Sequence, residues 1–197
     1  MTLSVTAPLD MKLPTGKMSD KEFVAFCADN PELRIEQDQY QNVIVMPPLK
    51  GDSTIYEKHA IVEVGIWEKT NGGVSTSSAG GFKLPNGATR CPDACWVSNE
   101  RWATLSDKEK MEFLPVVPDF VMEIRSQSDS LTKLKAKMQE WIDNSVRLAW
   151  LIDPKTKKTH IYREGNSVEI IEGFEKVLSG EDVMVGFEFD LKLLRIP

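Results

Sequence analysis

The segment from residue 120 to residue 152 most constrains how this chain can fold. It opens with the apolar run 120–124, which Glu123 interrupts, and it ends with the near-continuous apolar run 146–152. Between these runs, apolar residues recur at steps of three and four, which predicts an amphipathic helix over 131–142. Two buried strands joined by a helix favour neighbouring parallel strands with a right-handed crossover.

The rest of the chain predicts helices and hairpins around this unit. Capping boxes at 19–22 and 54–57 begin two predicted helices, and a third helical segment is expected over 99–114. The predicted strands pair as two hairpins, 33–37 with 42–46 and 159–162 with 168–171. The fold class is therefore α/β, a mixed β-sheet flanked by helices with added β-hairpins. We expect an irregular N-terminal arm over residues 1–17 and a single domain over 18–197.

Composition limits the classes of function. The 197 residues are 41% hydrophobic and 27% charged, as in an ordinary globular domain. We find no apolar run of about 20 residues and no basic and apolar leader, so we expect a cytoplasmic protein without a membrane partner. The net charge of −6 means that any nucleic-acid binding must depend on local basic clusters.

Several common catalytic arrangements have little support. The chain has no Gly-rich phosphate loop and no Gly-X-Ser-X-Gly motif. Its two histidines, His59 and His160, are isolated and fit structural roles better than catalytic ones. Cys91 and Cys95 have no second pair of ligands for zinc, and three cysteines in all argue against a disulfide framework.

Acidic residues in apolar surroundings are the remaining candidates. Asp93 opens an apolar strand just after Pro92, and Glu123 lies near the end of another. A carboxylate is costly in an apolar strand unless it is paired, hydrogen-bonded or bound to a metal. Two carboxylates at adjacent strand ends suit a hard divalent cation such as Mg²⁺. The alternative is that Asp93 caps the turn after Pro92, while Glu123 pairs with Arg125 or a helix lysine.

The predicted helix after the Glu123 strand carries basic residues beside its apolar stripe. Lys133 and Lys137 are four residues apart, so they share one helix face. A strand carboxylate followed by lysines directed back toward it is a plausible active-site layout. A solvated basic face is the alternative, since charge runs are usually exposed.

These residues also carry a resemblance to a known family. Pro92-Asp93, then Glu123-Ile124-Arg125-Ser126 at a spacing of 30 residues (123 − 93), Lys137 and the run 150–154 resemble the putative restriction endonuclease family of the PD-(D/E)XK nuclease superfamily. The resemblance covers roughly 19–197. It implies a restriction-endonuclease-like core and a metal-dependent endonuclease that hydrolyses phosphodiester bonds in DNA.

The resemblance assigns roles to individual residues. It implies that Asp93 and Glu123 bind Mg²⁺ or Mn²⁺, with the Ile124 carbonyl as a third oxygen ligand. Glu36 matches an acidic position of the family, where it would orient a metal-bound water.

One position departs from the family pattern. The superfamily lysine is expected two residues after the glutamate, where this chain has Arg125, which cannot act as a base. Lys137 on the following helix is the candidate to replace that lysine, and Lys133 is the reserve. Arg125 and Lys133 are expected to contact the substrate.

Two further expectations concern function and assembly. The alternative function is a catalytically weak or inactive nuclease-fold protein that binds nucleic acid or a protein partner, which Arg125 and the net charge favour. Because cleavage of both strands needs two active sites, we also expect a homodimer. The apolar patch for that contact would be formed by Trp141, Phe187, Phe189, Leu191 and Leu194. Their alternative role is to close the core of the monomer.

Overall fold

The computed structural model describes residues 9–11, 18–165 and 167–195. Its helices are α1 (Asp20–Asp29), α2 (Gly51–Asn71), α3 (Asn99–Trp102), α4 (Leu131–Asp143) and the 3-10 helices η1 (Glu109–Met111) and η2 (Leu191–Leu194). Its strands are β1 (Leu9–Met11), β2 (Arg34–Gln37), β3 (Val43–Met46), β4 (Val74–Thr76), β5 (Phe82–Lys83), β6 (Thr89–Arg90), β7 (Ala94–Val97), β8 (Phe120–Ile124), β9 (Leu148–Asp153), β10 (Lys158–Arg163), β11 (Ser167–Glu172), β12 (Val177–Ser179) and β13 (Glu188–Asp190). In these ranges, no helix is long and apolar enough to cross a membrane.

The central sheet has six strands in the order β11-β10-β9-β8-β7-β4. Strands β8 and β9 run parallel, with Phe120 opposite Leu148, and α4 connects them. The other neighbouring pairs of this sheet are antiparallel. The parallel pair predicted around residues 120–152 and the mixed α/β sheet are thus confirmed.

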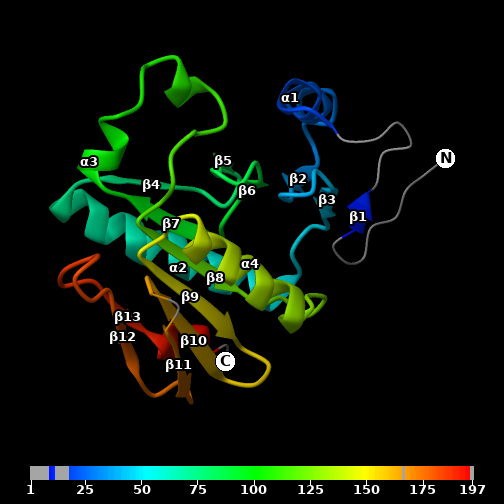
Figure 1. Ribbon diagram of the computed structural model, residues 1–197. Coiled ribbons are helices and arrows are strands. Elements are labelled where there is room, and N and C mark those ends of the chain that lie inside the picture. Colours follow the sequence, from blue (N-terminus) through cyan, green and yellow to red (C-terminus); the bar gives the residue numbers. More distant parts are fainter. Residues whose placement is uncertain (1–8, 12–17, 166, 196–197) are drawn as a thin grey trace.

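Helices cover both faces of the central sheet, with α4 on one side and α2 on the other (Figure 1). Phe120 and Met122 of β8 pack in the core shared with α2, whereas Val121 packs in the core under α4. Side chains alternate along a strand, so Glu123 is directed to the α4 face together with Val121. Because of this alternation, the carboxylate of Glu123 lies between the sheet and α4.

A second sheet lies beside the central one, in the order β1-β3-β2-β6-β5 (Figure 1). The predicted β2–β3 hairpin is present, and Phe23 of α1 packs in its core with Ile35. Residues 9–11 form β1 and pair with β3, where the sequence predicted an irregular arm. Residues 1–8 and 12–17 of that arm lie outside the described residues.

The prediction of a helix over 99–114 is wrong for most of that range. Only α3 and η1 are helical there. A capping box forms at Ser106, because its hydroxyl accepts from the Glu109 N–H at 3.3 Å and its own N–H donates to Glu109 Oε2 at 2.8 Å. No apolar stripe follows it, and a capped turn without a face to bury does not propagate into a helix.

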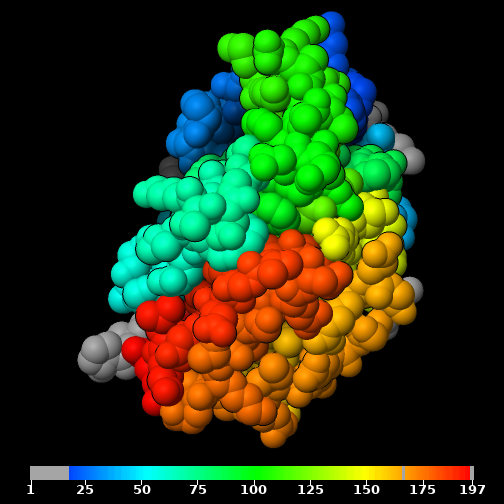
Figure 2. Space-filling model, turned by 90° about the vertical axis from the view of Figure 1, so that its left-hand side faces the viewer, coloured from blue at the N-terminus to red at the C-terminus, as the bar shows by residue number. Residues whose placement is uncertain are grey.

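The C-terminal segment closes the core on the α2 side of the sheet. Figure 2 shows this segment, in orange and red, against α2 in teal, and Trp67 Nε1 donates to Val185 O at 3.3 Å. The side chain of Phe187 is 2% exposed, and its ring stacks 5.8 Å from that of Trp150.

The predicted dimer patch is therefore wrong. The five residues assigned to it are all buried within the chain; they are Trp141, Phe187, Phe189, Leu191 and Leu194. The alternative, that they close the monomer core, is the arrangement found, because each side chain fills space against the central sheet.

Candidate active site

Asp93 and Glu123 lie on neighbouring strands of the central sheet. Strands β7 and β8 are antiparallel with Ala94 opposite Met122, and this register, continued by one residue, sets Asp93 opposite Glu123. The backbone N–H of Ile124 donates to Asp93 Oδ2 at 2.8 Å and fastens the carboxylate to β8. The two acids thus share one end of the strand pair.

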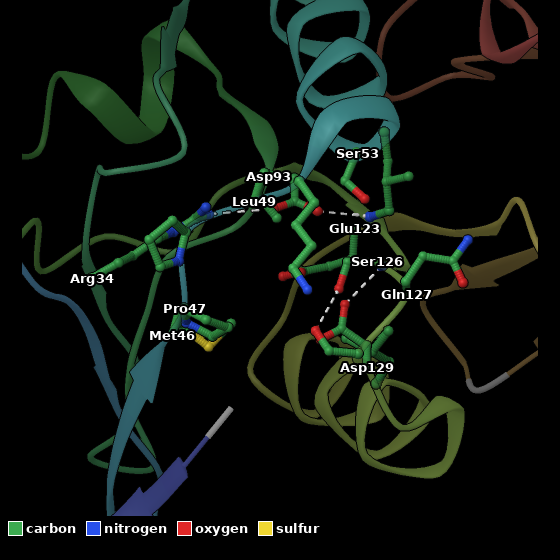
Figure 3. Close-up of a pocket in the computed structure, with 15 residues that line it drawn as sticks. Arg34, Met46, Pro47, Leu49, Ser53, Asp93, Glu123, Ser126, Gln127 and Asp129 are labelled. Atoms are coloured by element: carbon green, nitrogen blue, oxygen red, sulfur yellow. Dashed lines mark hydrogen bonds and ion pairs between the residues drawn. The ribbon is translucent and has the colours of Figure 1, made fainter. Parts of the chain in front are cut away.

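Both carboxylates line a cavity of about 340 Å³ (Figure 3). The cavity lies where the two sheets meet, because β2 contributes Arg34, and the end of β3 with the loop after it contributes residues 46–50 to its wall. Ile124, the loop 126–129, Ser53 of α2 and Leu134 of α4 complete the lining. The cavity is therefore bounded by elements far apart in sequence.

Lys137 reaches the carboxylates from α4. Its Nζ lies 2.7 Å from Glu123 Oε1 and 2.8 Å from Glu36 Oε1. Helix side chains tilt toward the helix N-terminus, and α4 begins just after the Glu123 strand, so the side chain extends back over the sheet end. The structure brings together three of the residues predicted from sequence: Glu36, Glu123 and Lys137.

Burial controls the protonation of the site. It raises the pKa of Glu123 to about 7, against the opposing effect of Lys137. Burial also raises the pKa of Asp93 above its usual value, although Arg34 and the Ile124 N–H oppose it. Burial alone would raise the pKa of Glu36 as well, but Lys137 and Arg90 outweigh it and lower the pKa to about 2. Burial therefore favours the protonated form of Asp93 and Glu123, whereas Glu36 stays ionised beside Lys137 and Arg90.

Comparison with known proteins identifies the family. The sequence matches Uma2, described as putative restriction endonuclease, over residues 20–192. The chain belongs to this family. The crystal structure of a putative nuclease belonging to DUF820 from Anabaena variabilis ATCC 29413 shares the fold, with a TM-score of 0.69 and 17% identity over 81% of this chain and 88% of that one. No curated protein matches the chain.

The donor set of this Uma2 protein suits a hard divalent cation. Asp93, Glu123 and Ile124 offer carboxylate and carbonyl oxygens at one cavity, and a bound dication would favour the ionised form of both acids against the effect of burial. In the described ranges, no group of three or more His, Cys, Asp or Glu side chains could hold a metal. The remaining ligands of an Mg²⁺ ion would have to be backbone oxygens, waters or substrate oxygens.

Two residues expected to contact the substrate do not line the cavity of Asp93 and Glu123. Arg125 donates to Asp153 Oδ2 at 2.8 Å and to the Asp129 carbonyl at 3.2 Å, so its guanidinium holds the loop after β8. Lys133 lines a second cavity of about 280 Å³ on the other side of α4's first turns, together with Glu36 and Lys137. Neither Lys133 nor Glu36 lines the cavity of Asp93 and Glu123, and Glu36 reaches the site only through Lys137.

Some contacts of the Uma2 site had no sequence prediction. The Arg34 guanidinium contacts Asp93 Oδ1 at 3.3 Å, and Arg90 links Glu36 at 3.1 Å to Glu140 at 2.6 Å. Arg34 could have been found, because strand alternation puts it on the same face as Glu36. No local pattern pointed to Arg90, whose partners lie 54 and 50 residues away.

The indole of Trp141 is the other missed contact. Its Nε1–H donates to Glu123 Oε1 at 3.2 Å. The sequence placed Trp141 only in the apolar stripe of the helix, yet a buried indole N–H usually finds an acceptor. Lys137 and Trp141 together hold one oxygen of Glu123, which leaves Oε2 as the oxygen from which Glu123 can reach a ligand.

Proposed function

We propose that this protein is a metal-dependent endonuclease that hydrolyses phosphodiester bonds in DNA at the cavity of Asp93 and Glu123. The observation that carries the proposal is the pairing of these two acids on adjacent strands, with Lys137 Nζ 2.7 Å from Glu123. Membership of a family of putative restriction endonucleases supports the same reaction class.

Asp93, Glu123 and the Ile124 carbonyl would hold Mg²⁺ or Mn²⁺. Such an ion supplies an activated water at neutral pH and positive charge for the phosphoryl oxygens. The chain's own contribution is to keep the donor oxygens in place: the Ile124 N–H holds Asp93, while Lys137 and Trp141 hold Glu123. In the hydrolysis, the bond between phosphorus and the water oxygen would form as the bond between phosphorus and the leaving ester oxygen breaks, and solvent would take the proton of the water and supply one to the leaving oxygen.

Lys137 acts in this proposal as a positioning residue. An ammonium has three N–H donors, and those of Lys137 face Glu36, Glu123 and the Cys91 carbonyl, the last at 3.4 Å. Burial would lower the pKa of Lys137, but Glu123 and Glu36 outweigh it and raise the pKa. The lysine therefore stays charged, orients Glu123 and does not serve as a base.

A cleavage assay on supercoiled plasmid DNA tests the proposal. We expect the parent protein to cleave with Mg²⁺ or Mn²⁺ and to stop in EDTA, and we expect Asp93→Asn and Glu123→Gln each to abolish cleavage. Glu169→Gln on β11 is the matched control, because this glutamate is exposed and pairs with Arg163 away from the cavity. Cleavage by Asp93→Asn at the parent rate would overturn the site assignment.

The second candidate function is a nuclease-fold protein without catalysis that binds nucleic acid or a protein partner. It is favoured by Arg34, which occupies Asp93 Oδ1, and by Arg125, which turns to Asp153. Titration with Mn²⁺, followed by thermal shift and by a cleavage assay, distinguishes the two functions. DNA binding in Mn²⁺ without metal-dependent stabilisation or cleavage would support the second function.

A further inference from the structure

Arg34 contacts one oxygen of the Asp93 carboxylate, and the backbone of β8 holds the other. The backbone N–H of Ile124 holds Asp93 Oδ2 at 2.8 Å, and Arg34 Nη2 lies 3.3 Å from the other oxygen, Oδ1 (Figure 3). Arg34 Nη1 contacts Glu57 Oε2 at 3.4 Å. The oxygen of Asp93 that is available for a ligand is thus the one that Arg34 neutralises.

The ion pairs of Arg34 are longer than the other ion pairs of the site. Charge-assisted N–H···O bonds are typically about 2.7–2.9 Å long, and Lys137–Glu123 and Arg125–Asp153 measure 2.7 and 2.8 Å. Both contacts of Arg34 are longer, and its buried Nε finds no partner among the described residues. The side chain is 24% exposed and lines the cavity, so its guanidinium can turn inward.

We propose that Arg34 is an exchangeable counter-ion, which neutralises Asp93 in the metal-free protein and moves to the substrate phosphate when a divalent cation takes Asp93 Oδ1. This inference rests on the proposed function. A guanidinium and a dication at one oxygen repel each other, so one displaces the other. A displaced arginine at the wall of the cavity meets a phosphate in the geometry that guanidinium binds best, through two parallel N–H donors.

The exchange makes Arg34 a competitor of the metal. An opposite charge next to a carboxylate stabilises the ionised group by about 1–3 pKa units, and that stabilisation must be given up when the cation binds. Removal of the guanidinium should therefore tighten metal binding, whereas loss of a residue with a merely structural role would weaken it. The same removal should weaken DNA binding only when metal is present.

Calorimetric titration with Mn²⁺ in the absence of DNA is the first measurement. We expect Arg34→Gln to bind Mn²⁺ about tenfold more tightly than the parent, by the charge argument above. Arg163→Gln is the control: Arg163 also bridges two carboxylates, those of Glu169 and Glu181, but it does not line the cavity. Its affinity for Mn²⁺ should equal that of the parent.

Fluorescence anisotropy of a short DNA duplex is the second measurement. Arg34→Gln should bind DNA like the parent in EDTA and about tenfold more weakly with Ca²⁺, because the lost phosphate contact exists only after exchange. Equal losses in EDTA and in Ca²⁺ would contradict the exchange.

The outcomes separate this inference from the function on which it rests. If the parent binds Mn²⁺ and cleaves DNA while Arg34→Gln binds Mn²⁺ no more tightly, only the exchange is overturned. If neither protein binds Mn²⁺, both proposals fail. Arg34→Lys guards against misfolding of the first variant: it retains the positive charge beside Asp93, so it should bind Mn²⁺ like the parent, and a tenfold gain in affinity for Arg34→Lys would contradict the charge argument.

Discussion

Lys137 compensates two buried carboxylates, those of Glu36 and Glu123. The sequence placed it beside the apolar stripe of the helix, with a solvated basic face as the alternative. In the structure Lys137 is 9% exposed and lies between the two acids. Removal of one partner from a buried ion pair leaves an uncompensated charge, which costs more than the pair contributes.

We expect Lys137→Ala to lower the free energy of unfolding by about 3–5 kcal/mol at pH 7, as for other broken buried ion pairs. Urea unfolding followed by circular dichroism measures this change. Lys135→Ala is the control at an exposed position of the same helix, and it should cost less than about 0.5 kcal/mol. Equal stabilities for the two variants would show that Lys137 carries no structural charge compensation.

Metal affinity should depend on pH through Glu123. Its carboxylate must be ionised to bind a cation, and burial raises its pKa to about 7. Below that pH the proton competes with the metal, so affinity falls as pH falls. We expect Mn²⁺ to bind about tenfold more weakly at pH 6 than at pH 8, as one group with this pKa requires. Calorimetry at both pH values measures the ratio, and an unchanged affinity would exclude Glu123 as a titrating ligand.

At the scale of elements, β2 and α4 supply the charges that surround the acids. Arg34 and Glu36 of β2 point to the site, while Ile35 between them packs in the core of the second sheet. The inner face of α4 carries Lys137 and Trp141 to the same carboxylate. Each element thus uses its own periodicity, two for the strand and 3.6 for the helix, to present polar groups together.

The hydrogen bond from α4 to Glu123 can be tested by Trp141→Phe, which retains an aromatic ring and removes the N–H donor. A buried hydrogen bond to a charged group contributes about 1.5–3 kcal/mol, and we expect a loss of unfolding free energy in that range. Trp150→Phe is the matched control, because Trp150 Nε1 is buried without a partner in the described residues.

Chemical unfolding of both tryptophan variants gives the comparison. The loss for Trp141→Phe should exceed the loss for Trp150→Phe, since both variants remove a similar volume from a fully buried position. A larger loss for Trp150→Phe would mean that ring packing outweighs the bond to Glu123.

At the scale of the whole molecule, the chain returns at its C-terminus to cover the face of the sheet opposite the site. The ring of Phe187 lies 5.9 Å from that of Phe120 and 6.2 Å from that of Trp67, so it joins the C-terminal segment to β8 and α2. Glu123 on one face of β8 is therefore supported by packing on the other face. A homodimer remains a prediction, and its contact would have to use other residues.

We expect Phe187→Ala to lower the free energy of unfolding by about 3–5 kcal/mol, as for other buried aromatic residues replaced by alanine. Because Phe187 lies inside the chain, the folded variant should keep the oligomeric state of the parent. Unfolding curves and light scattering together check this expectation. Dissociation of a parent dimer by Phe187→Ala, without loss of stability, would show that Phe187 lies at an interface between subunits.

The sequence by itself determined the βαβ unit, the β2–β3 hairpin and the pairing of Asp93 with Glu123 as candidates. These features are local or periodic: a buried acid in an apolar strand, a lysine on a helix face, and a crossover of fixed hand. The sequence by itself did not predict the long-range contacts. Arg34 meets Asp93 across 59 residues, and Lys137 meets Glu36 across 101, so no periodicity encodes them.

Only the tertiary structure decided which oppositely charged residues pair, and where the apolar C-terminal segment packs. Lys137 could have been solvated or buried, and Arg125 could have faced the acids or the loop, because each choice depends on what the second sheet brings opposite α4. Phe187 could have served an interface or the core, because apolar surface is removed from water equally well by either. Packing of distant segments settles these alternatives, and it is a property of the folded chain and not of any one stretch of it.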